Sequence, residues 1–184
     1  MAHDIPTLTT ERLILRPFTM EDAPQVQALA GAAEVAATTL NLPYPYPEGA
    51  AVAWIDTHAA AAAEGIAVTW AIVRAADVLL IGAIVLGVVP RHARGELGYW
   101  LGVPYWNHGY TSEAARRVTM FGLVDRGLHR IQSMCYPHNC ASARVMEKAG
   151  LRYEGLLREY IRKGATFEDV LMYGLVRTDV ERLS

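Results

Sequence analysis

The stretch that decides the fold covers residues 95–115 and reads GELGYWLGVPYWNHGYTSEAA. Residues 96–103 are rich in aromatic and aliphatic side chains, which predicts a buried strand, and Pro104 ends it. A turn around Gly109 follows, and residues 111–113 open a helix. A strand, a glycine turn and a helix N-terminus in this order leave backbone N–H groups free, and the helix dipole adds partial positive charge. The stretch therefore predicts an anion site that suits a phosphate group.

This stretch lacks the residues of two common nucleotide-binding loops. It matches neither the pattern G-x-x-x-x-G-K-[ST] nor the pattern G-x-G-x-x-G. A single glycine between a strand and a helix is more often only a turn. The rest of the chain must therefore decide whether the turn belongs to a binding site.

Length and composition limit the classes of protein that fit the chain. The 184 residues predict one domain over residues 1–184, and 52% hydrophobic with 20% charged residues argue against disorder. A net charge of −2 gives no reason to expect a nucleic-acid surface. Cys135 and Cys140 are too few for a disulfide framework or a zinc site, so we expect no metal and a cytoplasmic location. The apolar run at residues 78–89 is too short to span a bilayer, and we expect neither a signal peptide nor a membrane partner.

Hydrophobic periodicity predicts about seven strands and about four helices. The strands are expected at residues 9–18, 68–73, 78–89, 96–103, 129–136, 151–160 and 167–176, and the helices at residues 19–30, 48–64, 112–126 and 139–149. Thr19 and Asp22 form a predicted capping box, and Asn139 is a predicted N-cap. This order predicts an α+β fold with a mixed sheet. Its antiparallel pairing comes first, and the helix after the phosphate turn joins a parallel pair.

Several side chains are interpreted from the same periodicity. Helical spacing puts Phe121 and Val124 together on the buried face of the helix at residues 112–126. Tyr99 and Trp100 are expected to pack in the hydrophobic core. Residues 41–47 hold three prolines and cannot form regular structure, so they are either a stiff connector or one wall of a substrate cleft.

Three motifs together resemble a known family. They are ERLILRP at residues 11–17, ELGYWL at residues 96–101 followed by WNHGYTSEA at residues 106–114, and NCASARVMEKAGL at residues 139–151. This combination closely resembles the GNAT acetyltransferases and, within them, the RimJ/RimL-like branch. The resemblance covers nearly the whole chain, from Thr9 to Val180.

The resemblance implies a fold, a donor and an acceptor. The fold would be that of GNAT enzymes, with a central parallel pair of strands and a V-shaped opening between the strands that end at Val103 and Tyr136. The thioester of acetyl-CoA would thread into this opening and meet a primary amine. The acceptor would be a protein N-terminal amine, as in RimJ/RimL-like enzymes, or a small amine such as a polyamine or an antibiotic.

The expected cofactor contacts follow the strand and the turn. Pyrophosphate would lie on the N–H groups of the turn, where Gly109 lets the backbone come close, and the pantetheine amides would pair with the preceding strand. Asn139 would cap its helix and contact the cofactor or an ordered water. Two positions depart from the family's usual phosphate pattern. Trp106 stands where the pattern usually has Gln or Arg, and Thr111 stands where it usually has Gly or Ala. The cofactor-binding residues are expected to be Leu101, Gly102, Val103, His108, Gly109, Tyr110, Thr111, Ser112 and Asn139.

Acetyl transfer needs a base for the amine, a donor for the thioester oxygen and a partner for the leaving thiolate. The resemblance makes Glu96 the base, acting through water, although it could equally be a solvated charge at a strand end. It places the thioester oxygen on the N–H of Leu101. Met146 stands where many members carry an acidic tyrosine, and the RimJ/RimL-like branch has serine at the position of Ser142 instead. Ser142 could also simply bond the backbone in the first helical turn, and Tyr136 is a second candidate donor.

Other interpretations stay open at this point. Without the acidic tyrosine, the chain could be a CoA-binding regulatory module that has lost turnover. The loops at residues 41–47 and 158–167, which would contact the acceptor, are the parts that the family does not fix. Cys140 is expected to be a neighbour of the cofactor and no nucleophile, because the family transfers acetyl directly. A homodimer is one option for the oligomeric state, which the sequence leaves undetermined.

Overall fold

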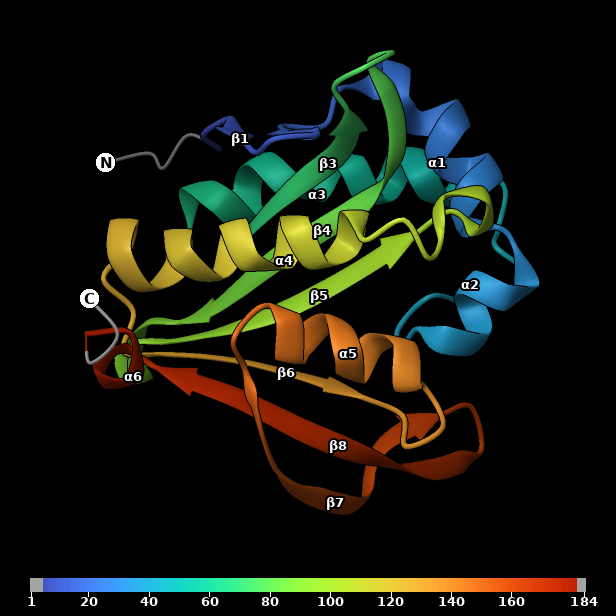
Figure 1. Ribbon diagram of the computed structural model, residues 1–184. Helices are drawn as coiled ribbons and strands as arrows, with labels where there is room; N and C mark the ends of the chain where they lie inside the picture. Colours follow the sequence, from blue (N-terminus) through green and yellow to red (C-terminus); the bar gives the residue numbers. More distant parts are fainter. Residues whose placement is uncertain (1–4, 182–184) are drawn as a thin grey trace.

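The computed structural model describes residues 5–181 and arranges them around one mixed sheet of eight strands (Figure 1). The strand order is β1-β2-β3-β4-β5-β6-β8-β7. Only β5 and β6 are parallel, and all other neighbours are antiparallel. The α+β prediction with a central parallel pair is therefore confirmed. The strands are β1 (Leu8–Thr9), β2 (Leu13–Arg16), β3 (Ala67–Arg74), β4 (Leu79–Val89), β5 (Arg94–Leu101), β6 (Arg130–Cys135), β7 (Arg152–Lys163) and β8 (Thr166–Val176).

Helices cover both faces of the sheet, and each face has its own buried cluster. On one face α1 and α3 pack on the sheet around Val26, Ile55 and Trp100. On the other face α4 and α5 pack around Val118 and Met146 (Figure 1). None of the helices within residues 5–181 has the length and apolar character needed to cross a membrane. The α-helices are α1 (Ala23–Ala30), α2 (Ala33–Thr38), α3 (Ala50–Ala63), α4 (Tyr110–Met120), α5 (Cys140–Lys148) and α6 (Arg177–Glu181).

Local capping signals fix the ends of two helical segments where the sequence predicts them. Thr19 and Asp22 form the capping box ahead of α1, with the Thr19 N–H donating to Asp22 Oδ2 over 2.8 Å. The Asn139 side chain accepts from the N–H of Ser142 over 3.0 Å and caps α5. Gly150, with φ of +94°, lies directly beyond the end of α5. Both predicted caps are confirmed.

The structure also corrects the predicted elements. The two-residue strand β1 and the helices α2 and α6 are additional, so about seven strands and four helices was an undercount. Helix α4 begins at Tyr110, and a π-helical turn at Phe121–Asp125 follows its last residue. A π turn holds more residues than an α turn, so it shifts the angular phase of the side chains. Val124 is therefore 63% exposed, and the prediction that it is buried was wrong.

The parallel strands β5 and β6 stay paired over only part of their length. The register runs from Arg94 opposite Arg130 to Glu96 opposite Gln132, and beyond this point the strands diverge. One side-chain bond extends the contact, because the Ser133 hydroxyl donates to the Leu97 carbonyl over 2.9 Å. The opening implied by the family resemblance is thus present at the centre of the sheet.

Candidate active site

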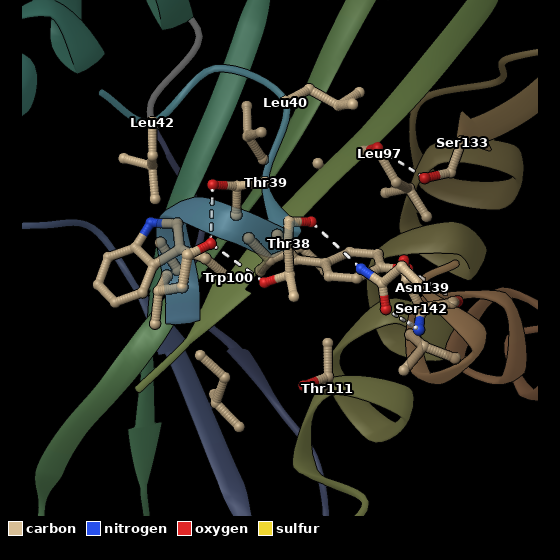
Figure 2. Close-up of a pocket in the computed structure, with 18 of the residues that line it drawn as sticks. Thr38, Thr39, Leu40, Leu42, Leu97, Trp100, Thr111, Ser133, Asn139 and Ser142 are labelled. Atoms are coloured by element: carbon tan, nitrogen blue, oxygen red, sulfur yellow. Dashed lines mark hydrogen bonds between the residues drawn. The ribbon is translucent and has the colours of Figure 1, made fainter. Parts of the chain in front are cut away.

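A cavity of about 800 Å³ fills the opening between β5 and β6 and reaches both faces of the sheet. On the α4 face it is lined by Tyr99 and by the N-terminal turns of α4 and α5. On the α3 face it is lined by Glu96 and Trp100, which alternate along β5 with Tyr99. Figure 2 shows Trp100 on one side of this space, with Asn139 and Ser142 on the other. The cavity can therefore be entered from either face of the sheet, and the two entrances meet between β5 and β6.

The turn before α4 has the geometry of an anion site. Asn107 and Gly109 both have positive φ, at +63° and +80°, which turns the chain sharply into the helix. Glu113 is the first residue whose N–H bonds back into the turn, to the Gly109 carbonyl over 3.1 Å. The N–H groups of the first helical turn before it have no partner within the helix, as at any helix start. Gly109, Tyr110, Thr111 and Ser112 all line the cavity.

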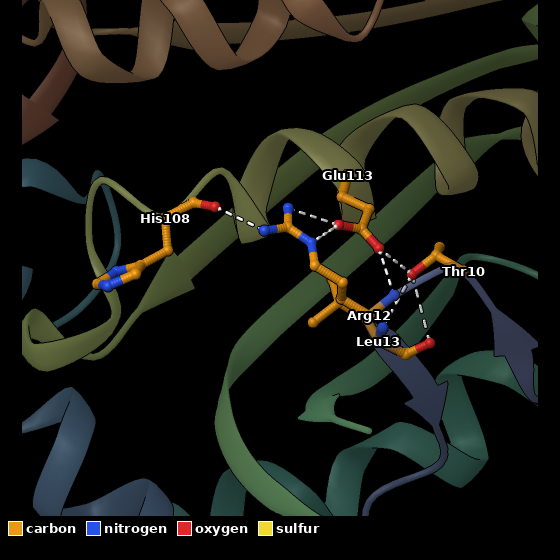
Figure 3. Close-up of polar contacts among 5 residues, drawn as sticks. All are labelled: Thr10, Arg12, Leu13, His108 and Glu113. Atoms are coloured by element: carbon orange, nitrogen blue, oxygen red, sulfur yellow. Dashed lines mark hydrogen bonds and ion pairs between the residues drawn. The ribbon is translucent and has the colours of Figure 1, made fainter. Parts of the chain in front are cut away.

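Arg12 fixes this turn against β2, a role that the sequence did not reveal. Its Nη1 donates to the His108 carbonyl over 3.0 Å, and its Nε donates to Glu113 Oε2 over 2.7 Å (Figure 3). Thr10 donates to the same carboxylate over 2.6 Å. Burial alone would raise the pKa of Glu113, but the hydrogen bonds from Thr10 and Arg12 outweigh it and lower that pKa. The turn is therefore preorganised, and the Arg12 guanidinium lies 4.9 Å from the Tyr110 ring.

His108 lies in the turn, but its side chain is outside the cavity lining. The ring is exposed, stacks on Tyr110 and places Nδ1 2.7 Å from the Trp106 carbonyl. The expected contribution of His108 to phosphate binding is thus limited to its backbone.

The free edge of β5 presents alternate N–H groups to the cavity. The Gly102 N–H donates to the Ile81 carbonyl over 2.9 Å, so even-numbered residues pair with β4. The N–H groups of odd-numbered residues, including Tyr99 and Leu101, then point to the opposite edge of β5, which β6 no longer pairs with at this position. The N–H of Gly102, one of the expected cofactor-binding residues, is therefore engaged with β4. Val103 lies beyond the strand in a 3₁₀ turn and, like Gly102, is not part of the cavity lining.

Two carbonyl groups at the end of β5 accept hydrogen bonds from within the protein. The Trp106 indole donates to the Leu101 carbonyl over 2.7 Å, and the backbone N–H of Tyr105 donates to the Gly102 carbonyl over 2.9 Å. The edge therefore offers the N–H groups of Tyr99 and Leu101 together with the Tyr99 carbonyl. Such donors suit the carbonyl oxygens of an amide chain or of a thioester.

Glu96 lies at the point where β5 and β6 separate. Its side chain is exposed, lines the cavity and shares its face of the sheet with Trp100. Gln132 donates through Nε2 to Glu96 Oε2 over 2.9 Å, which restrains the carboxylate and leaves Oε1 without a protein donor among the described residues. The carboxylate is placed to accept a proton from a group that enters from the α3 face.

Ser142 and Tyr99 form a hydroxyl pair on the opposite side of the cavity. Their oxygens are 2.9 Å apart, and both residues line the cavity. Burial raises the pKa of Tyr99, so its hydroxyl keeps its proton at neutral pH. Tyr99 is therefore more than the core residue that its strand pattern predicted. Tyr136, the second candidate donor, is 3% exposed and is not part of the lining.

Helix α2, which the sequence did not predict, closes one end of the opening. Asn139 Nδ2 donates to the Thr38 carbonyl over 3.2 Å, as Figure 2 shows. Lys163, at the end of β7, donates through Nζ to the carbonyls of Ala36 and Thr39, each over 2.9 Å. These bonds satisfy carbonyls at the C-terminal end of α2, which cannot bond within the helix.

Two cationic side chains on α5 also line the cavity and were missed. Arg144 and Lys148 are four residues apart and share the cavity-facing side of the helix with Ala141 and Val145. That spacing is visible in the motif at residues 139–151 and was the available signal. The two charges would favour an anionic ligand beside the turn. No group of metal-ligating side chains was found among residues 5–181.

Comparison with known proteins agrees with this geometry. Residues 12–152 match the sequence profile of a family described as "Acetyltransferase (GNAT) domain". The chain belongs to the GNAT acetyltransferase family. It is 34% identical over 173 residues to the uncharacterized N-acetyltransferase YoaA of Bacillus subtilis, covering 94% of this chain and 97% of YoaA. GNAT acetyltransferases use acetyl-CoA as the donor, so this chain is an acetyl-CoA-dependent acetyltransferase.

Solved structures of GNAT enzymes share the fold. An acetyltransferase from Bacillus anthracis superposes with a TM-score of 0.84 at 26% identity, covering 94% of this chain and 99% of that chain. RimJ of Mycobacterium smegmatis, solved in complex with CoA-disulfide, gives a TM-score of 0.85 at 21% identity and covers 96% of this chain and 90% of its own. By their chemistry, the N–H groups along the β5 edge would suit amide carbonyls, and the turn before α4 and the α5 cations would suit phosphate groups.

A buried histidine packs behind the α3 side of the cavity. His58 on α3 is 6% exposed, and its ring lies 4.4 Å from Trp54 and 5.3 Å from Phe18. Neither ring nitrogen has a hydrogen-bond partner within the described part of the chain. Burial lowers the pKa of His58 from 6.5 to about 4.

This depressed pKa predicts a loss of stability in mild acid. Between pH 6.5 and about 4 the unfolded chain binds a proton that folded His58 does not, so the free energy of unfolding should fall as the pH falls. Each unit of pKa difference is about 1.4 kcal/mol, so we expect a total loss of roughly 3 kcal/mol, of which about 2 kcal/mol falls between pH 7 and pH 5. Urea unfolding of wild type and His58→Phe at pH 7 and pH 5 measures the effect. Equal pH dependence in both proteins would show that His58 is not its source.

Proposed function

We propose that the chain transfers acetyl from acetyl-CoA directly to a primary amine, without an acetyl-enzyme intermediate. The observation that supports this most is the cavity itself, because it joins the cofactor edge of β5 to the face that carries Glu96. Two substrates can therefore meet from opposite sides of the sheet. Cys135 is buried, Cys140 is exposed, and neither cysteine is part of the cavity lining, which argues against a cysteine nucleophile.

The chain's own groups suit the three requirements of the reaction. Glu96 would take the proton from the amine, through water where the distance requires it. The N–H groups of Leu101 and Tyr99 would donate to the thioester oxygen as it gains negative charge. The Ser142 hydroxyl, paired with Tyr99, would donate a hydrogen bond to the leaving sulfur. This set of groups in one cavity argues against a module that only binds CoA.

The acceptor has two candidate classes. The RimJ/RimL-like motifs favour a protein N-terminal amine. The bonds from Asn139 and Lys163 hold α2 across the end of the opening, and this restriction favours a small amine. Both classes share the same chemistry at the reacting nitrogen.

A thiol-release assay tests the proposed function. Acetyl-CoA is incubated with the protein and a mixture of primary amines, and free CoA is measured with a disulfide reagent. We expect CoA release that depends on both the amine and the protein. CoA release at the same rate with and without amine would contradict acetyl transfer and would indicate simple hydrolysis.

Replacing Ser142 with alanine should slow turnover with little change in acetyl-CoA affinity. A hydrogen bond to a charged atom contributes about 1.5–3 kcal/mol, so we expect kcat to fall by about 10- to 100-fold. Because Tyr99 would act through Ser142, Tyr99→Phe should add little to Ser142→Ala in the double variant. The measurements are kcat from thiol release and Kd from calorimetry.

Tyr136→Phe is the control for this pair, since that hydroxyl lies outside the cavity lining. It should turn over at the wild-type rate. If kcat were reduced in Tyr136→Phe and unchanged in Ser142→Ala, Tyr136 would be the hydrogen-bond donor to the leaving thiolate.

A further inference from the structure

We infer that the acceptor is a small primary amine with a single positive charge on an uncharged, apolar or aromatic body. This inference rests on the proposed function and concerns the part of the cavity on the α3 face, which we call the acceptor chamber. Its walls include Tyr46, Trp54, Thr69, Val85, Glu96 and Trp100.

The floor of the acceptor chamber is formed by the strands of the sheet, which carry small side chains there. Thr69, Val85 and Gly98 are cross-strand partners on β3, β4 and β5 and therefore share one face. Gly87 and Glu96 are the next partners along the same face. The absence of large side chains at both glycines leaves depth beside the Glu96 carboxylate. An amine on a slender arm can therefore reach the level of the sheet.

Charge separates the possible acceptors. Of the described residues lining the acceptor chamber, Glu96 is the only one with a carboxylate, guanidinium or ammonium side chain, since Arg144 and Lys148 lie on the α5 side. Polyamines and aminoglycosides carry several ammonium groups, and each additional one would enter the chamber without a carboxylate partner. An ammonium group that leaves water for the apolar walls of the chamber without gaining a carboxylate partner binds unfavourably. A free amino acid is disfavoured for the same reason, because its carboxylate would meet no cation.

Aromatic side chains form a rigid wall opposite the reacting point. Trp54 and Trp100 lie with ring centroids 6.5 Å apart, and both line the cavity. Phe18 packs edge-on against Trp54 with ring centroids 5.2 Å apart, and His58 also contacts the Trp54 ring. These two contacts restrict rotation of the Trp54 indole. Flat apolar groups gain both burial and ring contacts on such a wall.

Helix α2 limits how far the acceptor can extend. Val35, Thr38 and Thr39 of this region line the cavity, and the helix is tied down by Asn139 and Lys163. A compact amine fits beneath this cover without breaking those bonds. A folded protein presenting its N-terminus would need the cover to move.

A comparison of amine acceptors tests the inference directly. We would measure kcat/KM for phenylethylamine, hexylamine, spermidine, kanamycin and an alanine-initiated hexapeptide on the wild-type protein, and record the melting temperature with acetyl-CoA in parallel. Phenylethylamine and hexylamine should exceed spermidine and kanamycin by at least about 10-fold, because no second carboxylate offsets the cost of burying a further charge.

Two variants sharpen the test. Trp100→Ala should reduce kcat/KM for phenylethylamine more than for hexylamine, because it removes part of the aromatic wall. Leu42→Glu adds a carboxylate at the half-buried rim and should raise kcat/KM for spermidine relative to wild type. Val52→Glu is the control, since Val52 is 50% exposed on α3 and lies outside the lining.

The outcomes distinguish this inference from the proposed function. Faster turnover of spermidine, kanamycin or the hexapeptide than of phenylethylamine would overturn the inference and leave acetyl transfer intact. If acetyl-CoA raises the melting temperature but no amine is acetylated, the proposed function fails and the inference fails with it.

Discussion

Glu96→Gln is expected to lower kcat by about 100- to 10,000-fold, the usual contribution of a general base. The reason is its position at the separation of β5 and β6, with Gln132 restraining one carboxylate oxygen and the other open to the cavity. Glutamine keeps the shape of the side chain but cannot take a proton from the amine. Acetyl-CoA affinity should change little, because the side chain faces the acceptor chamber.

The pH dependence supplies a second signature for Glu96. At high pH more of the amine is already unprotonated, so the defect of Glu96→Gln should shrink as the pH rises. Glu64→Gln is the matched control, since Glu64 is an exposed carboxylate at the end of α3 and is not part of the cavity lining. An unchanged rate for Glu96→Gln at neutral pH would show that the amine loses its proton without this residue.

Gly109→Val is expected to abolish the rise in melting temperature that acetyl-CoA produces. Gly109 has φ of +80°, and a branched side chain there would both strain the turn and cover the N–H groups before α4. A ligand that binds only the native state at 100 times its Kd stabilises it by about 2.7 kcal/mol, and this shift should disappear. ATP and NAD should give the wild-type protein no comparable shift, because the turn lacks their recognition residues.

Gly127 provides a matched control for this variant. It has φ of +68°, and an added Cβ would lie 3.4 Å from Arg177 Nη2, much as one at Gly109 would lie 3.5 Å from Arg12 Nη2. Gly127→Val should therefore carry a similar backbone strain at the other end of the same helical segment and keep its response to acetyl-CoA. Loss of the response in both variants would attribute the effect to general destabilisation.

The sequence predicted those parts of the fold that local patterns determine. Alternation and capping signals located the long strands and the helix that begins after Asn139, because both depend on neighbours in the chain. Helix α2 has only six residues, and its end is held by Lys163 and Asn139 from distant segments. Tertiary bonds of this kind leave no local signal, so α2 and the cover that it forms could not be predicted.

The candidate site shows the same division. Gly109, Ser142 and Glu96 were found through motifs, and the structure brings them to one cavity. Tyr99 was interpreted as core because a strand pattern does not reveal where a neighbouring strand departs. Arg12 was missed because its partner Glu113 is 101 residues away in the sequence.

The oligomeric state, the extent of the domain and the location of the protein remain predictions from the sequence. The acceptor chamber and the β5 edge lie within one chain, so the proposed reaction requires no second copy. Size-exclusion chromatography with light scattering would test whether a homodimer forms.

Intact-mass spectrometry tests whether acetyl passes directly from acetyl-CoA to the amine. The protein is mixed first with acetyl-CoA alone and then with acetyl-CoA and phenylethylamine, and protein mass, free CoA and acetylated amine are quantified over time. We predict an unchanged protein mass in both mixtures and one acetylated amine for each CoA released. A protein that gains one acetyl group from acetyl-CoA alone and loses it when the amine is added would contradict direct transfer.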